Sequence, residues 1–234
     1  MRYRLTLTAL AGPAVAQSPA GTPQELLARM GQTYAAFDST CQMRAEVSRH
    51  TVAGGMTRDT KRDFRFYQKG SALRLESGPP KDALVLLRRA DGGIVEHSRN
   101  ANLFAVREPG AQTAAEATLL RCRNILQRRF AGLAATEPTI TSAKEEEFRH
   151  GKERRNCLRI GLKGSTWTAT IWVERSSALV WHSTMRAQRE AGLDEEEITW
   201  FEIEDGKGLP PDMFEFEPPH GAKRVPRLLT VPLH

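Results

Sequence analysis

The sequence lacks the short motifs around which catalytic sites are usually built. It contains no G-x-S-x-G nucleophile elbow and no G-x-x-x-x-G-K-[ST] phosphate loop. Its six histidines show no paired metal-ligand spacing such as H-x-x-x-H, so each is interpreted as a surface or sheet histidine. Gly206 and Gly208 run straight into Leu209-Pro210-Pro211, where a dinucleotide fingerprint would need a helix. We therefore expect no enzymatic activity, no catalytic residue, no metal and no cofactor.

Cysteine is scarce and odd in number. The three residues, Cys41, Cys122 and Cys157, include no C-x-x-C pair of the kind that holds zinc. At most one intramolecular disulfide can form, which leaves at least one thiol free. Two alternatives stay open: three buried free thiols, or a Cys122–Cys157 disulfide that joins a helix to a strand.

Long hydrophobic runs are also missing. No stretch approaches the roughly 18 apolar residues that a membrane-spanning helix needs, so no stable membrane insertion is expected. A short apolar run, 5–11, does follow Arg2 and Arg4, and Ala14-Val15-Ala16 has the A-x-A form of a cleavage site. This pattern predicts that residues 1–16 are a signal peptide, cleaved near Ala16, and that 17–234 form a single domain. Because Gln17 and not cysteine follows the site, we expect an exported, unlipidated protein in the periplasm of a Gram-negative cell.

The charge balance gives no sign of nucleic-acid binding. The formal net charge is +6, with 40% apolar and 26% charged residues, which is typical of a soluble globular protein with a core. Four arginines, 121, 123, 128 and 129, crowd one expected helix, but no aromatic residues are interleaved with them for base stacking. We expect no nucleic-acid partner.

Two amphipathic helices are expected. Thr22-Pro23-Gln24-Glu25 has the form of a capping box, and apolar residues follow it at helical spacing. Thr113-x-x-Glu116 is a second box, followed by a stripe made of Leu119, Cys122, Leu126 and Phe130.

The rest of the chain reads as antiparallel strands at short spacing. Alternating apolar residues and glycine-rich turns predict consecutive hairpins, which curl toward a half-open barrel. The apolar stripes of the helices must be covered, and the natural cover is the concave face of that sheet. The fold class is therefore mainly β (α+β). The expected strands are 41–48, 63–68, 72–76, 83–89, 94–97, 103–106, 139–144, 157–162, 167–174, 179–187 and 196–204.

The C-terminal run is expected to close the sheet. Phe214 and Phe216 lie two residues apart, so on a strand both rings would point to the same side. Pro218 and Pro219 then stop further pairing, because proline has no backbone donor. We interpret the two phenylalanines as an anchor for the sheet and not as ligand contacts.

Several of these segments together resemble the LolA-like superfamily of periplasmic lipoprotein carriers. The ending of that family is similar to the following runs: Trp172-Val173-Glu174, Ser176-Ser177-Ala178-Leu179-Val180, Thr199-Trp200-Phe201-Glu202-Ile203, Leu209-Pro210 and Phe214-Glu215-Phe216-Glu217-Pro218-Pro219-His220-Gly221. Upstream, Phe66, Gly70 and Leu73-Arg74-Leu75-Glu76 are similar to the family's hairpin before its "R-x-E" strand.

The resemblance implies an unclosed antiparallel half-barrel of about ten to eleven strands, with lid helices across the concave face. It implies a monomeric, non-enzymatic carrier or chaperone that binds acyl chains of lipids or lipoproteins in outer-membrane lipoprotein sorting. An arginine on the early strands that locks the lid is typical of the carriers, and Arg44 and Arg49 are candidates. The alternative is an envelope-stress regulator or scaffold related to RseB, which would bind an envelope protein partner or a lipid signal.

An apolar cavity between helices and sheet would bind chains without any polar constellation, because each buried CH₂ contributes about 0.8 kcal/mol. The expected ligand residues are those whose side chains we expect to face that cavity. They are Met30, Met43, Val47, Phe64, Phe66, Leu73, Leu75, Leu119, Leu126 and Phe130.

Overall fold

The computed structural model describes residues 21–110, 113–189 and 192–228, so the predicted signal peptide lies outside the described residues. No helix in these ranges is long and apolar enough to cross a membrane. The elements are α1 (Pro23–Ala36), β1 (Thr40–Ala53), β2 (Met56–Lys69), β3 (Ala72–Ser77), β4 (Leu84–Arg88), β5 (Ile94–Ser98), β6 (Leu103–Arg107), α2 (Ala114–Arg123), the π-helical turn η1 (Asn124–Arg128), α3 (Arg129–Ala135), β7 (Thr139–His150), β8 (Glu153–Lys163), β9 (Trp167–Glu174), β10 (Val180–Arg189), β11 (Gly192–Glu204), the 3₁₀ turn η2 (Pro211–Phe214) and β12 (Lys223–Arg224).

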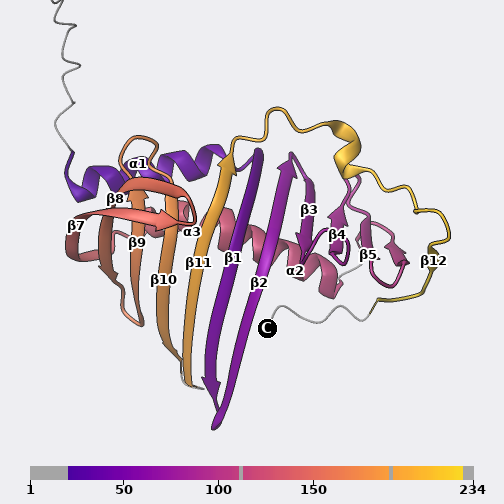
Figure 1. Cartoon of the computed structure of the whole chain (residues 1–234), viewed down its shortest axis with the longest axis horizontal. Coiled ribbons are helices and arrows are strands. Elements are labelled where there is room, and N and C mark those ends of the chain that lie inside the picture. Colours follow the sequence, from indigo (N-terminus) through magenta and orange to yellow (C-terminus); the bar gives the residue numbers. More distant parts are fainter. Residues whose placement is uncertain (1–20, 111–112, 190–191, 229–234) are drawn as a thin grey trace, which may run out of the picture.

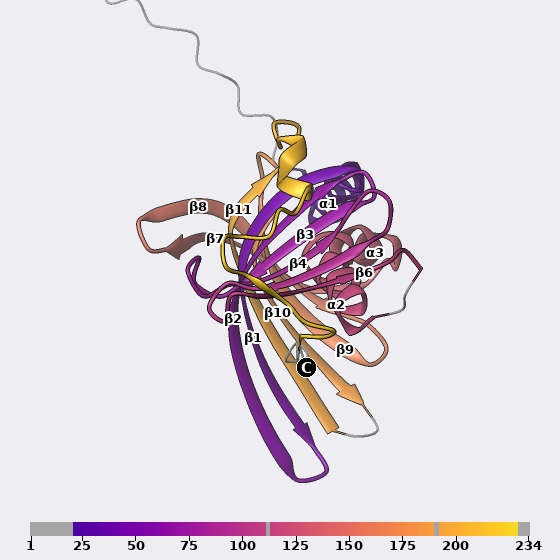
Figure 2. The same ribbon diagram turned by 90° about the vertical axis from the view of Figure 1, so that its right-hand side faces the viewer.

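All twelve strands belong to one sheet, in the order β12-β6-β5-β4-β3-β2-β1-β11-β10-β9-β8-β7. Every neighbouring pair is antiparallel except β12 with β6. The edge strands β12 and β7 do not pair with each other, so the barrel is not closed. The helices cross one face of the curved sheet, which we call the inner face (Figures 1 and 2). The predicted half-barrel with helices across its concave face is confirmed.

The hairpin of β1 and β2 is longer than the sequence predicts. Each strand has fourteen residues, and the chain turns at Gly54 and Gly55, whose φ angles of +56° and +78° favour glycine. Met43 pairs with Phe66 on one side and with Ile203 of β11 on the other, so all three face the same way. The ends of β1, β2, β10 and β11 extend beyond the helices (Figure 1), which leaves the inner face uncovered there.

Both helices start at the expected residues, with Thr22 and Thr113 as N-caps. In α1 the Thr22 hydroxyl accepts from the Glu25 amide at 3.2 Å, and the Glu25 carboxylate accepts from the Thr22 amide at 2.7 Å. In α2 only half of the predicted box forms: Thr113 accepts from the Glu116 amide at 3.0 Å. The Glu116 carboxylate turns instead toward Arg88 of β4, 3.4 Å away.

Two apolar cores lie on opposite faces of the sheet. The main core fills the space between the helices and the inner face. A smaller core lies on the outer face, where Leu209 and Phe214 of the C-terminal segment pack on Ala72, Leu87 and Val95 of the strands. Both phenylalanines of that segment contact the sheet. The centre of the Phe216 ring lies 5.4 Å from the ring centre of His97 and 5.4 Å from that of Phe104.

The prediction that Phe214 and Phe216 lie on a strand is wrong. Phe214 ends the 3₁₀ turn η2, and Phe216 lies in irregular backbone beyond it. Prolines at 210, 211, 218 and 219 remove the amide donors that a ladder would need on both sides. The segment crosses the strands and is tied to them by side chains: Lys69 and Arg74 donate to the carbonyls of Leu209 and Met213 at 2.9 and 2.8 Å.

The three cysteines are free and buried, so the alternative without a Cys122–Cys157 disulfide describes this structure. Burial raises the pKa of each thiol to about 12. Each thiol is therefore protonated at neutral pH and is a poor nucleophile.

Candidate functional site

The sequence-predicted ligand residues all lie at the interface between the helices and the inner face. Nine of them are buried, and Val47 is half-buried at the edge of this interface. They come from α1, β1, β2, β3, α2, η1 and α3, which are widely separated in sequence. The nine are Met30, Met43, Phe64, Phe66, Leu73, Leu75, Leu119, Leu126 and Phe130.

A small cavity opens at the edge of this interface, where the helical cover ends and the bare sheet begins. Its apolar wall is made by Val47 and Phe64 of the sheet and by Cys122, Ile125 and Leu126 of the helices. Its volume is about 40 Å³. Ligand pockets usually have volumes of about 300–1,000 Å³, so a chain can enter only if the helices move away from the sheet.

The cavity also contains residues that the sequence did not single out as ligand contacts. Cys122 was expected on the apolar stripe of the helix, but not at an opening, and Ile125 adds to the wall beside it. The rim is charged: Arg49, Arg62, Arg121 and Glu196 surround the apolar wall. Arg62 and Phe64 lie two residues apart on β2, so their side chains point to the same face of the sheet. Because Phe64 was expected to face the helices, the sequence could also have placed Arg62 on the inner face.

Polar contacts hold the helices over the sheet at a few points. The Tyr34 hydroxyl of α1 accepts from the Val180 amide of β10 at 3.2 Å. Arg129 of α3 forms an ion pair with Glu196 of β11. Aromatic contacts add to these ties, with the Phe130 ring 5.0 Å from Tyr34 and 5.3 Å from Trp200.

A π-helical turn interrupts the expected single helix directly over the cavity. It includes Ile125 and Leu126 of the cavity wall, and the fully buried Gln127. The Gln127 amide donates to the Phe37 carbonyl at the end of α1, while its Oε1 has no partner among the described residues. Such turns are frequent at functional sites, and an unpaired buried oxygen costs about 1–3 kcal/mol. The irregular part of the helical cover therefore coincides with the wall of the cavity.

The two candidate locking arginines lie on opposite faces of the sheet. Arg44 points outward, with its guanidinium 5.3 Å from the centre of the Phe201 ring. Arg49 points inward and its Nε donates to Asp194 of β11 at 2.7 Å. Ion pairs between helices and sheet in the described residues include Arg129–Glu196 and Arg88–Glu116, whereas Arg49 pairs with Asp194 within the sheet.

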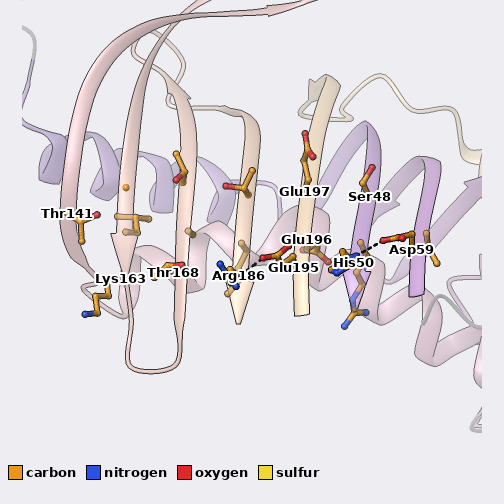
Figure 3. Close-up of a pocket in the computed structure, with 18 of the residues that line it drawn as sticks. Ser48, His50, Asp59, Thr141, Lys163, Thr168, Arg186, Glu195, Glu196 and Glu197 are labelled. Atoms are coloured by element: carbon orange, nitrogen blue, oxygen red, sulfur yellow. Dashed lines mark hydrogen bonds and ion pairs between the residues drawn. The ribbon is translucent and has the colours of Figure 1, made fainter. Parts of the chain in front are cut away.

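The outer face carries a larger and more polar groove, of about 800 Å³, across β7–β11, β1 and β2 (Figure 3). Ser48 and Glu197 alternate with Val47 and Ile198 of the main core, so they point away from the helices. Neighbouring charges pair with each other: His50 Nδ1 lies 2.6 Å from Asp59, and Arg186 Nε lies 3.1 Å from Glu195. The described part of the chain holds no cluster of three His, Cys, Asp or Glu residues that could bind a metal.

The far end of the β7–β8 hairpin lies on the outer side of the sheet, opposite the helices (Figure 2). Phe148 stacks on His182 of β10 with ring centres 5.4 Å apart and 16° between planes. His182 Nδ1 lies 2.9 Å from the Thr199 hydroxyl, and burial lowers the pKa of this imidazole. On the other side of the ring, His182 Nε2 lies 3.6 Å from the Glu197 carboxylate, so the imidazole lies between two side chains of β11.

No protein-family model matches the sequence, and no curated protein matches it. Solved structures to which the chain is similar include MucB, at 14% identity and a TM-score of 0.45, over 82% of this chain and 62% of that one. A LolA superfamily protein from Nitrosomonas europaea has 12% identity and a TM-score of 0.33, over 83% and 98% of the two chains. The MucA/MucB complex of Pseudomonas aeruginosa has 11% identity and a TM-score of 0.42, over 83% and 60%.

The LolA superfamily, which the sequence resembles, is thus represented among the similar solved structures. The chain spans less than two thirds of the length of the MucB chains. At identities and TM-scores this low, the likenesses carry no weight for function.

Proposed function

We propose that this protein is a non-enzymatic carrier or chaperone of the periplasm that binds acyl chains of lipids or lipoproteins. The chains enter between the helices and the inner face of the sheet, in the service of outer-membrane lipoprotein sorting. The observation that supports this most is the apolar interface with a cavity at its open edge, bounded by Val47, Phe64 and Leu126. The N-terminal A-x-A pattern supports export.

In this proposal, an acyl chain binds only when the helices move away from the sheet. The side chains that would face a bound chain face one another in the closed form, so a ligand replaces apolar contacts with apolar contacts. Each CH₂ that enters from water gains about 0.8 kcal/mol, which offsets the loss of the few polar ties between helices and sheet. The apolar residues therefore serve as core when the site is empty and as binding surface when it is filled.

A Val47→Trp substitution tests whether the cavity is the entrance. The indole would occupy the opening, so we expect the affinity for the neutral fluorescent probe N-phenyl-1-naphthylamine to fall by about tenfold or more, or ~1.4 kcal/mol. Lipid recovered by solvent extraction and mass spectrometry should fall in parallel.

The matched control is Thr51→Trp, on the same strand and face but beyond the cavity lining. It should bind the probe like the unmodified protein. Equal affinity in both variants, or an unmodified protein that carries no lipid and takes up no probe, would overturn the proposed function.

A second candidate function is recognition of an envelope protein partner, and the outer groove is the observation that favours it. Serine, threonine and paired charges line this groove, a composition suited to a polar protein surface. A photo-crosslinking amino acid at Thr170 in the groove, compared with one at the exposed Arg58 outside it, tests this idea in periplasmic extract. We expect a discrete crosslinked product from the Thr170 position alone; equal labelling at both positions would count against a partner site.

A further inference from the structure

The rim of the inner cavity holds two arginines that have no polar partner among the described residues. Arg62 lies on β2 and Arg121 on α2, both half-buried, and they line the same cavity from its two sides. Neither guanidinium makes a hydrogen bond or ion pair with any described residue, whereas most arginines of the described chain do. Both lie close enough to Cys122 for their charges to lower the pKa of its thiol, against the larger effect of burial.

The other charges of the rim are already neutralised. Arg49 forms a two-pronged ion pair with Asp194, through Nε at 2.7 Å and Nη2 at 2.5 Å. Glu196 is paired with Arg129 of α3. The excess positive charge at the opening therefore belongs to Arg62 and Arg121.

Two half-buried guanidiniums without an anion are unfavourable, because each loses hydration and each repels the other. An anion between them would remove both costs. Guanidinium presents a planar fork of donors that matches a phosphate or a carboxylate with two parallel hydrogen bonds. A neutral head group would leave the charges unpaired, so the rim discriminates by charge.

The apolar wall begins directly behind these charges, at Val47, Phe64 and Leu126. We infer that the preferred ligand of this site is an anionic amphiphile: its phosphate or carboxylate binds Arg62 and Arg121, and its chain enters beneath the π-helical turn. This inference rests on the proposed function, because it names the ligand class of the same site.

The test compares ligands that share one chain and differ in head group. Dodecyl phosphate, dodecanoate and dodecanol, each below its micelle concentration, displace N-phenyl-1-naphthylamine from the purified protein. We expect the two anions to bind more tightly than dodecanol by about tenfold or more, or ~1.4 kcal/mol, because charge-assisted hydrogen bonds form. Dodecyl phosphate and dodecanoate separate a phosphate head from a carboxylate head.

The variant that carries the test is Arg62→Gln with Arg121→Gln. It should reduce the preference to about twofold or less while dodecanol binds as before. The control is Arg58→Gln, an arginine of the same strand and face that lies outside the cavity lining; it should keep the full preference. If the glutamine pair does not fold by circular dichroism, Arg62→Lys with Arg121→Lys keeps the charge, removes the fork and should lose part of the preference.

The outcomes separate the two proposals. A preference for anions that survives in the folded double variant, or equal binding of anions and dodecanol to the unmodified protein, overturns the anionic head group and leaves acyl-chain binding in place. Failure of the probe and of all three chains to bind the unmodified protein overturns the proposed function, and this inference with it.

Discussion

Replacing Phe130 with alanine is expected to lower the free energy of unfolding by about 3–5 kcal/mol, the cost of removing a buried aromatic ring from a packed core. Phe130 is only 1% exposed. Its ring contacts Tyr34 of α1 and Trp200 of β11, so it joins α3 both to the other helix and to the sheet. Urea unfolding followed by tryptophan fluorescence measures the loss, since Trp200 is next to the new void.

The same substitution should also increase uptake of the neutral probe. If the helices must leave the sheet before a chain can enter, weakening their contact raises the population of the open form. We therefore expect Phe130→Ala to bind N-phenyl-1-naphthylamine faster than the unmodified protein at a denaturant concentration where both remain folded.

The control removes an equal ring from the opposite face of the sheet. Phe148 of β7 is half-buried, and its ring stacks on His182 of β10 on the outer side of the sheet. Phe148→Ala should cost about 1–2 kcal/mol, less than a core ring, and leave probe uptake unchanged. A Phe130→Ala protein that unfolds like the unmodified one, or that takes up the probe no faster while folded, would show that the helices are not a movable cover.

The inward-facing residues of the strands could be predicted because a strand alternates with a fixed period of two. Val47 and Phe64 face the helices as expected, since one apolar residue fixes the facing of all others in its strand. The ends of the strands could not be predicted in the same way. Beyond Val47, β1 continues through polar residues to Ala53 because pairing with both β2 and β11 satisfies its backbone.

The π-helical turn and the charged rim could not be predicted from the sequence, for a different reason. A stripe of Leu119, Leu126 and Phe130 predicts one helix face but not an extra residue within a turn. Arg62 on a strand and Arg121 on a helix each look like solvent-facing charges. Only the packing of the helices across the sheet places them around one cavity, and that arrangement is a long-range property of the fold.

The second large effect is expected on the outer face, at Glu76 of β3. Its carboxylate is 9% exposed and accepts hydrogen bonds from Arg74 at 2.7 and 3.0 Å and from Arg99 at 2.9 Å, with Arg65 at 3.9 Å. Glu76→Gln would leave three guanidiniums around a neutral group. Removing one partner of a buried ion pair lowers the free energy of unfolding by about 3–5 kcal/mol, and removing one partner of an exposed pair lowers it by at most about 1 kcal/mol. The arginines around Glu76 are half-buried, so we expect a loss of ~2–3 kcal/mol.

The loss should be felt first in the C-terminal segment, because Arg74 also donates to the Met213 carbonyl at 2.8 Å and so ties that segment to β3. Once the carboxylate no longer fixes Arg74, the cover over Leu87 and Val95 should open, and limited proteolysis should cut within 205–222 faster than in the unmodified protein. Glu153→Gln is the control: Glu153 is 59% exposed and pairs with Arg155 at 2.8 Å, so its loss should change stability by at most about 0.5 kcal/mol and leave cleavage unaltered. Equal effects of the two substitutions would show that the arginine cluster stabilises nothing beyond an ordinary surface pair, and that apolar contacts alone hold the segment on the sheet.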